Sequence, residues 1–383
     1  MPGDRGFDVL AEGSSRSWVS RIGGAMIGMV LGLALLPAGS ALLFWNEGRV
    51  VKTARALAEG AHLVLGVAAD RIDPANEGRL VHVSGPLDLG RVPRDPDFDL
   101  PSPPGTLRLL RKVEMFQWRE EQHSETRNQL GGGTETVTTF RYARAWSEGR
   151  IDSGRFRDPE GHENPHPRYS SASWMAEGMR LGGFRLDAAQ VGSPGSDEAL
   201  PARENRLGRI SGDALQLGAD AASPQVGDLR VSWRILRPDA LSVVAAQSGE
   251  GFAPYATRSG NRLFMVEAGR VPASDMFRAA EQENELFAWL LRAGGALAIL
   301  VGWSLLLAPL RVLADVIPLL GEIVGLGAGV LAFMLTLVLA PTMIGLAWLF
   351  HRPVLGIAAL LASACGMLGV AWLRRRGKAA RPA

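Results

Sequence analysis

Long apolar stretches divide this chain into segments of contrasting polarity. Residues 22–45 form an almost uninterrupted apolar run, and residues 293–313, 323–350 and 354–373 repeat the pattern later, with Arg311 as their one charge. At ~1.5 Å per residue, each stretch is long enough to cross the ~30 Å hydrocarbon core of a bilayer. The pattern therefore predicts four transmembrane helices.

The polar section between the first two spans, residues 46–286, shows a different periodicity. Apolar and polar residues alternate over several stretches, among them residues 107–120 and 134–146, which predicts β-strands. Gly131-Gly132-Gly133 separates these two stretches and predicts a hairpin. The expected fold class is therefore an α+β membrane protein, with a β-rich domain inserted between the first and second transmembrane helices.

The β-rich domain has an expected internal division and expected helices at both ends. A loop-like stretch rich in Gly, Ser, Pro and Asp suggests two β units, residues 61–185 and 205–272, either of which could be a small OB-type barrel. An amphipathic helix is expected over residues 48–59. Another is expected to begin at Ser274 and to continue directly into the second span through the segment 287–313.

Cations that flank the spans predict the orientation. Arg16 and Arg21 precede the first span, and a basic tail, residues 374–383, follows the last. Because Lys and Arg mark the cytoplasmic side, residues 1–21, the loop 314–322 and the tail are expected in the cytoplasm. Residues 46–286 are then expected outside it. A cleaved signal peptide ending near Ser40 is the alternative, but the apolar run continues past that point to Trp45.

Composition adds little to this picture. The net charge is +2 and acids are interspersed with bases, so no nucleic-acid footprint is predicted. The single cysteine, Cys365, lies in the last predicted span, so the polar domain cannot form a disulfide. The abundance of Ala, Gly and Arg indicates a bacterial source. The expected location is then the inner membrane with a periplasmic domain, or the endoplasmic reticulum and inner nuclear membrane in a eukaryote.

Glycines at helical spacing predict close helix packing within the membrane. Gly24, Gly28 and Gly32 recur every four residues in the first span, and Gly325 and Gly329 repeat the spacing in the third. Small residues on one face let another helix approach closely. Packing within the chain is favoured over a dedicated oligomer contact, because such spacing is common in any multi-span bundle.

The residues just after the first span predict a membrane-interface anchor. Trp45 suits the interface, Asn46 can begin a helix, and Glu47 would favour the positive end of that helix. Arg49 can reach lipid phosphates or pair with Glu47. A protein-binding role is the alternative.

Several unusual strings resemble those of the transmembrane protein 43 (LUMA) family. They include Asn46-Glu47-Gly48-Arg49, Val113-Glu114-Met115-Phe116-Gln117-Trp118, and Val226-Gly227-Asp228-Leu229-Arg230-Val231. Gly161-His162 with Asn164-Pro165, and Trp348-Leu349-Phe350 with Arg352-Pro353, complete the series. The role of these residues, from Glu114 and Trp118 to Arg352 and Pro353, is not implied.

The resemblance implies four spans, cytoplasmic termini and a large domain outside the cytoplasm. It also implies a non-enzymatic role in organising membranes, with self-association and no cofactor. Expected partners are membrane lipid, further copies of the chain, and unidentified membrane or envelope proteins.

Two alternatives with reactive or ion-binding residues are open. His162-Glu163-Asn164-Pro165-His166 fits the H-E-x-x-H zinc pattern and would make an envelope metallohydrolase, but Pro165 opposes the helix that such a site needs. Arg311, Asp315 and Glu322 could form an ion or proton relay of a sensor or transporter. An interfacial loop with solvated charges is favoured there, and a membrane scaffold is the leading interpretation of the whole chain.

Overall fold

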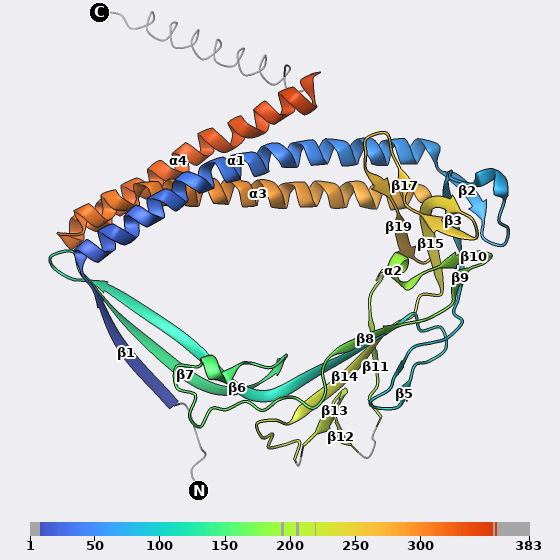
Figure 1. Ribbon diagram of the computed structural model, residues 1–383, viewed down its shortest axis with the longest axis horizontal. Coiled ribbons are helices and arrows are strands. Elements are labelled where there is room, and N and C mark those ends of the chain that lie inside the picture. The colour runs from blue at the N-terminus through green and yellow to red at the C-terminus, as the bar shows by residue number, and fades with distance from the viewer. Residues whose placement is uncertain (1–7, 193–194, 204–206, 219, 355–356, 358–383) are drawn as a thin grey trace, which may run out of the picture.

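A computed structural model of the chain describes residues 8–192, 195–203, 207–218, 220–354 and 357. Three long helices lie together along one side of it, as Figure 1 shows: α1 (Trp18–Leu63), α3 (Ala273–Ala314) and α4 (Pro318–His351). Each is long and apolar enough to cross a membrane. They confirm the first three apolar stretches as helices. The predicted fourth span, residues 354–373, lies outside the described residues apart from Val354 and Ile357.

Two of the helices extend well beyond the apolar stretches. With 46 residues, α1 is ~69 Å long, more than twice the thickness of a hydrocarbon core. The expectation that a new helix begins at Asn46 is wrong, because α1 runs unbroken through this position. The expected helix leading into the second span is confirmed, since α3 begins at Ala273 and continues to Ala314. Only residues 315–317 connect α3 to α4, so the connection is shorter than the expected loop 314–322.

Glycines bring α1 and α3 into close contact. A Cβ atom added to Gly32 would lie 2.6 Å from the carbonyl oxygen of Gly302, and one added to Gly39 would lie 3.0 Å from that of Gly295. At such separations an added Cβ would crowd the backbone of the facing helix, so glycine at these positions allows the close approach. The sequence pattern identified Gly32 but missed the other three.

The remaining glycines of the predicted pattern differ in their surroundings. A Cβ at Gly28 would meet Leu305 of α3 at 3.4 Å, whereas one at Gly24 would have nothing within 4 Å. On α4, Gly325 lies against the side chain of Arg311, and Gly329 faces open space. The glycine spacing therefore coincides with helix packing only in part.

Within the described residues, eight strands form the first sheet. They are β1 (Asp8–Arg16), β6 (Arg108–Asn128), β7 (Thr134–Glu148), β8 (Ala172–Met175), β11 (Glu198–Leu200), β12 (Arg209–Ser211), β13 (Ala214–Leu217) and β14 (Leu229–Leu236). The main order is β1-β7-β6-β14-β13-β12, with β11 beside β14 and β8 beside β6. Alternate residues of β6 and β14 are buried, including Leu109, Val113, Val231 and Trp233.

Seven strands of the described chain form the second sheet. They are β2 (Leu65–Ala68), β3 (Leu80–Asp88), β9 (Met179–Leu181), β10 (Phe184–Leu186), β15 (Ala240–Ser248), β16 (Gly251–Ala253) and β19 (Met265–Ala268). The main order is β10-β9-β3-β15-β16, with β2 beside β3 and β19 beside β15. Shorter elements complete the domain: β4 (Arg94–Asp95) pairs with β5 (Leu100–Pro101), β17 (Tyr255–Ala256) pairs with β18 (Arg262–Leu263), and α2 (Ala188–Val191) is a single turn.

Each sheet takes strands from both of the expected β units. The first sheet joins β6 to β14, and the second joins β3 to β15. The division into units 61–185 and 205–272 is therefore not confirmed, and neither are OB-type barrels. The domain is sheet-rich as expected, but its strands pair across the long loop that suggested a boundary.

A shared core attaches the second sheet to the ends of α1 and α3. Ala56 and Leu57 of α1 pack with Met276 and Phe277 of α3 and with Val244 of β15, and all five are nearly inaccessible to solvent. The polar ends of these helices therefore belong to the core of the β-rich domain.

The first sheet contacts the opposite end of the same helices. The expected hairpin is confirmed by β6 and β7, and its tip lies against the start of α1 in Figure 1. There Arg21 donates to the carbonyl oxygen of Gly132 at 2.6 Å. The amide of Gly131 in turn donates to the carbonyl oxygen of Val316 at 3.3 Å. The domain therefore contacts α1 on both sides of the apolar residues 22–45.

The segment before α1 was expected in the cytoplasm, yet it pairs with the domain. Strand β1 forms an antiparallel ladder along β7, from Asp8 opposite Tyr142 to Arg16 opposite Thr134. Two strands that share backbone hydrogen bonds must lie on the same side of a bilayer. This arrangement conflicts with the expected separation of residues 1–21 from residues 46–286 by a membrane.

Candidate functional site

A buried polar cluster joins α1, α3 and α4 just past the apolar part of α1. Glu47 has an exposed fraction of only 1%. Its carboxylate accepts hydrogen bonds from Arg292 of α3, through Nε at 2.7 Å and Nη2 at 2.9 Å. It also accepts one from the indole nitrogen of Trp348 of α4 at 2.9 Å. One carboxylate therefore ties three helices together.

The neighbouring residues of α1 also bind α3. Asn46 is fully buried and donates to the carbonyl oxygen of Ala288 at 3.1 Å. Arg49 donates to Asn284 Oδ1 at 3.0 Å, and Asn284 donates back to the carbonyl oxygen of Val50 at 3.3 Å. We call the cluster the three-helix clasp; it comprises Asn46, Glu47, Arg49, Asn284, Arg292 and Trp348.

The clasp changes the interpretation of the residues expected to form an interface anchor. Glu47 binds Arg292 in place of Arg49, and the Asn46 side chain binds α3 and does not begin a helix. Trp45 remains exposed, at 59%, as an interface residue would be. Arg292 was not expected to take part. The only signal for it in the sequence was its position as a cation at the edge of the second span.

The chemistry of the clasp is that of a fixed ion pair. Three donors occupy three of the about four acceptor positions of the Glu47 carboxylate, so most of its hydrogen-bonding capacity is used within the clasp. Two parallel hydrogen bonds from a guanidinium also fix the relative orientation of the helices. Removing one partner of a buried pair leaves an uncompensated charge, which costs several kcal/mol. The clasp therefore suits a mechanical role.

Three of the strings that carry the family resemblance meet at one place in the first sheet. Asn164 accepts from the Trp118 amide at 2.7 Å and donates to its carbonyl oxygen at 2.9 Å. Arg230 of β14 forms an ion pair with Glu114 of β6 at 2.9 Å. The carbonyl oxygen of Asp228 accepts from the Phe116 amide at 2.9 Å, and Pro165 packs against Gly227. These residues hold the loop at 161–167 against β6 and β14.

His162 is enclosed by aromatic rings at the same place. Its exposed fraction is 3%, its ring stacks on Tyr142 with centroids 4.0 Å apart, and Trp118 meets it edge-on at 4.7 Å. Residues 162–167 form no helix, so His162 and His166 do not face one metal as the zinc pattern requires. Among the described residues, no group of three potential metal ligands was found.

Tyr142 has an unusual environment beside His162. Burial, together with the hydrogen bond that its hydroxyl donates to Glu120 at 2.8 Å, raises the pKa of Tyr142 to about 12. The hydroxyl also accepts from the Asp158 amide at 2.9 Å. A neutral phenol thus links the two long strands of the hairpin to the loop that carries His162.

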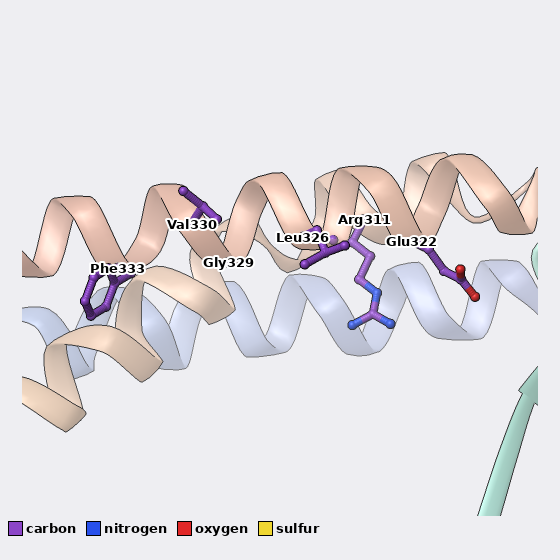
Figure 2. Close-up of a pocket in the computed structure, with 7 residues that line it drawn as sticks. Arg311, Glu322, Leu326, Gly329, Val330 and Phe333 are labelled. Atoms are coloured by element: carbon purple, nitrogen blue, oxygen red, sulfur yellow. The ribbon is translucent and has the colours of Figure 1, made fainter.

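The three charges of the proposed relay do not form one chain. Asp315 is buried and pairs with Arg21 at the start of α1. Arg311 and Glu322 instead line a groove of about 670 Å³ between α3 and α4, shown in Figure 2. We call it the Arg311 groove; its other lining residues are Gly325, Leu326, Gly329, Val330 and Phe333.

The end of α4 contacts α1 through the last string of the family resemblance. Arg352 donates its amide to the carbonyl oxygen of Trp348 at 2.7 Å and ends the helix. Arg352 and Pro353 line a small hollow beside Arg55 of α1. His351 lies against Gly48, where an added Cβ would be 2.9 Å from its Nε2. This turn is therefore part of the helix contact next to the clasp.

Comparison with known proteins identifies relatives of this chain. A family model described as transmembrane protein 43 matches residues 115–353. The mouse transmembrane protein 43 is 31% identical over 342 residues, which cover 85% of each chain. The human protein is 30% identical over 357 residues, covering 89% of this chain and 88% of the human one. A homologue from Drosophila melanogaster is 31% identical over 352 residues, covering 88% of this chain and 92% of its own.

No solved structure matches the chain. The family model covers more than half of the sequence, and the relatives extend the match over most of the remainder. The matched region contains the meeting point of the family strings in the first sheet, as well as Arg292 and Trp348 of the clasp. This chain therefore belongs to the transmembrane protein 43 family.

Proposed function

We propose that the protein is a non-enzymatic membrane scaffold that self-associates and binds protein or lipid through its β-rich domain. The observation that supports this most is the continuity of α1 and α3 from the apolar stretches into the core of the domain. The clasp adds a fixed contact to α4 at the point where apolar residues give way to polar ones. A domain held this rigidly suits assembly on a membrane.

The apolar segments of these helices cross the bilayer in this proposal. A helix that lies on a membrane surface needs a polar face, and residues 22–45 have none. Large apolar side chains are exposed on more than one side of α1, since Leu31 and Leu33 are both exposed and two successive steps of ~100° place them on nearly opposite sides of the helix. Lipid on all sides would cover them. The clasp and the second sheet then lie outside the cytoplasm, in the periplasm of a bacterium.

Insertion of the helices into a bilayer requires different contacts at their other end, where β1 and the hairpin tip lie. The distal part of β6, from Arg119 to Asn128, is almost entirely polar and exposed, so it cannot lie in lipid beside α1. Insertion of residues 22–45 must therefore separate β1 from β7 and the hairpin tip from Arg21. The paired arrangement and the inserted arrangement exclude one another.

A cysteine pair tests insertion directly. Ala11 of β1 and Thr139 of β7 lie opposite one another, and opposed residues of antiparallel strands have Cα atoms ~4.5–5.5 Å apart, within the range for a disulfide. In a Cys365→Ser background, the pair Ala11→Cys with Thr139→Cys should not form a disulfide when an oxidant is added to native membranes. Efficient formation there would overturn the proposed crossing.

A matched pair controls for access of the oxidant. Thr126 of β6 and Thr136 of β7 are opposite one another within the hairpin itself. Because the hairpin is the same in both arrangements, Thr126→Cys with Thr136→Cys should form its disulfide in membranes.

Self-association is tested by crosslinking in native membranes followed by mass spectrometry. The scaffold proposal predicts crosslinks between copies of the chain, as well as crosslinks from the β-rich domain to partner proteins. Recovery of a strict monomer in native lipid, without any partner, would contradict it.

A further inference from the structure

The Arg311 groove places one cation and one anion at the same end of an apolar channel (Figure 2). Arg311 lies on the last turn of α3, and Glu322 lies near the start of α4. Both side chains are exposed. Among the described residues, neither the guanidinium nor the carboxylate has a hydrogen-bond or ion-pair partner. Two unpaired opposite charges in one groove are well suited to a ligand that carries both signs.

The rest of the groove has the properties of a site for a hydrocarbon chain. The Arg311 side chain covers Gly325, whereas Gly329 leaves room along α4, and Val330 and Phe333 provide apolar walls with exposed fractions of 57% and 48%. The helix rises ~16 Å between Glu322 and Phe333, about half of the ~30 Å hydrocarbon core. The groove is therefore as long as one leaflet is thick.

We propose that the Arg311 groove binds one phospholipid whose headgroup carries a primary ammonium, such as phosphatidylethanolamine. Arg311 binds the phosphate, Glu322 accepts hydrogen bonds from the ammonium, and an acyl chain lies along α4 toward Phe333. Basic pockets between transmembrane helices bind lipid headgroups in this way. The proposal rests on the membrane insertion proposed above.

The headgroup chemistry follows from the two charges together. A purely anionic headgroup would satisfy Arg311 but would place its negative charge near Glu322. A choline headgroup has a cation, but its quaternary nitrogen has no hydrogen to donate to a carboxylate. Only a primary ammonium beside a phosphate serves both side chains.

The test is lipid retention measured by native mass spectrometry. The full chain is purified in detergent and equilibrated with equal amounts of phosphatidylethanolamine, phosphatidylcholine and phosphatidylglycerol. The wild-type protein should retain phosphatidylethanolamine preferentially. Arg311→Gln should lower the retention of phosphatidylethanolamine and phosphatidylglycerol about fivefold, the effect of one cation near a headgroup. Glu322→Gln should lower only phosphatidylethanolamine and thereby abolish the preference.

Two further variants separate the groove from general effects. Gly329→Leu fills the channel without altering either charge, and it should lower the retention of all three lipids equally. Arg16→Gln removes an exposed cation of β1 outside the groove and should change nothing. All variants should elute and melt like the wild-type protein, which excludes misfolding as the cause.

The outcomes separate this inference from the proposed function. Equal retention of the three headgroups by the wild-type protein, or identical selectivity in Glu322→Gln and the wild type, would overturn the groove proposal alone. Efficient disulfide formation between Ala11→Cys and Thr139→Cys in native membranes would instead show that the helices are not inserted, and it would remove the basis of both proposals.

Discussion

The three-helix clasp makes a quantitative prediction about stability. Glu47→Ala removes the carboxylate that accepts from Arg292 and Trp348, and it leaves the Arg292 guanidinium without its partner. Breaking a buried ion pair from one side costs ~3–5 kcal/mol. Because the Arg292 side chain keeps an exposed fraction of 18%, water can partly replace the lost partner, and we expect the lower end, about 3 kcal/mol.

The loss can be measured by denaturant unfolding in detergent, followed by tryptophan fluorescence. Arg292→Ala and the double variant complete a double-mutant cycle, in which we expect a coupling energy of ~2 kcal/mol between the two side chains. Glu285→Ala is the control, since Glu285 is an exposed acid on the same helix as Arg292, and it should change stability by less than ~0.5 kcal/mol. A loss below ~1 kcal/mol for Glu47→Ala, or additive single variants, would refute the clasp as a stabilising ion pair.

Three further predictions concern helix packing, the loop at the first sheet and pH. Gly32→Leu should destabilise the helices by ~1–3 kcal/mol in a detergent unfolding assay, because its side chain would collide with α3, whereas Gly24→Leu should have little effect. Asn164→Ala should lower the free energy of unfolding by ~1–3 kcal/mol, because it leaves buried backbone groups of β6 unpaired, and a melting curve that matches the wild type would contradict this. Because the pKa of Tyr142 is raised from 10.0 to about 12, its contribution to stability should be complete below pH 10 and lost as the pH rises toward 12. Unfolding measured across this range should lose that dependence in Tyr142→Phe.

The parts of the fold that follow from local pattern were predictable from the sequence. The lengths of the apolar stretches in α1, α3 and α4 match the thickness of a bilayer. Alternating apolar and polar residues on both sides of a glycine turn predict the β6–β7 hairpin. Strand β1 was missed, because residues 8–16 show no clear alternation and their partner lies more than a hundred positions later. The pairing of β6 with β14 was missed for the same reason, since strand order is decided by contacts distant in sequence.

The candidate site shows the same limit. The string at Asn46 and Glu47 was recognisable as unusual, and it lies just past an apolar stretch. Its partner was not recognisable, because Glu47 and Arg292 are 245 positions apart and Arg49, two positions away, was an equally suitable cation in the sequence. The packing of α1 on α3, set by Gly39 and Gly295, decides which cation reaches the carboxylate.

The unbroken length of α1 makes it a lever between lipid and domain. A helix adapts to a bilayer of different thickness mainly by changing its tilt. From the middle of the apolar stretch to Leu63 the helix extends ~45 Å, so a change in tilt of about 10° displaces its far end by about 8 Å. Because α3 packs alongside α1, both helices tilt together. A change in local membrane thickness would therefore shift the position of the whole β-rich domain.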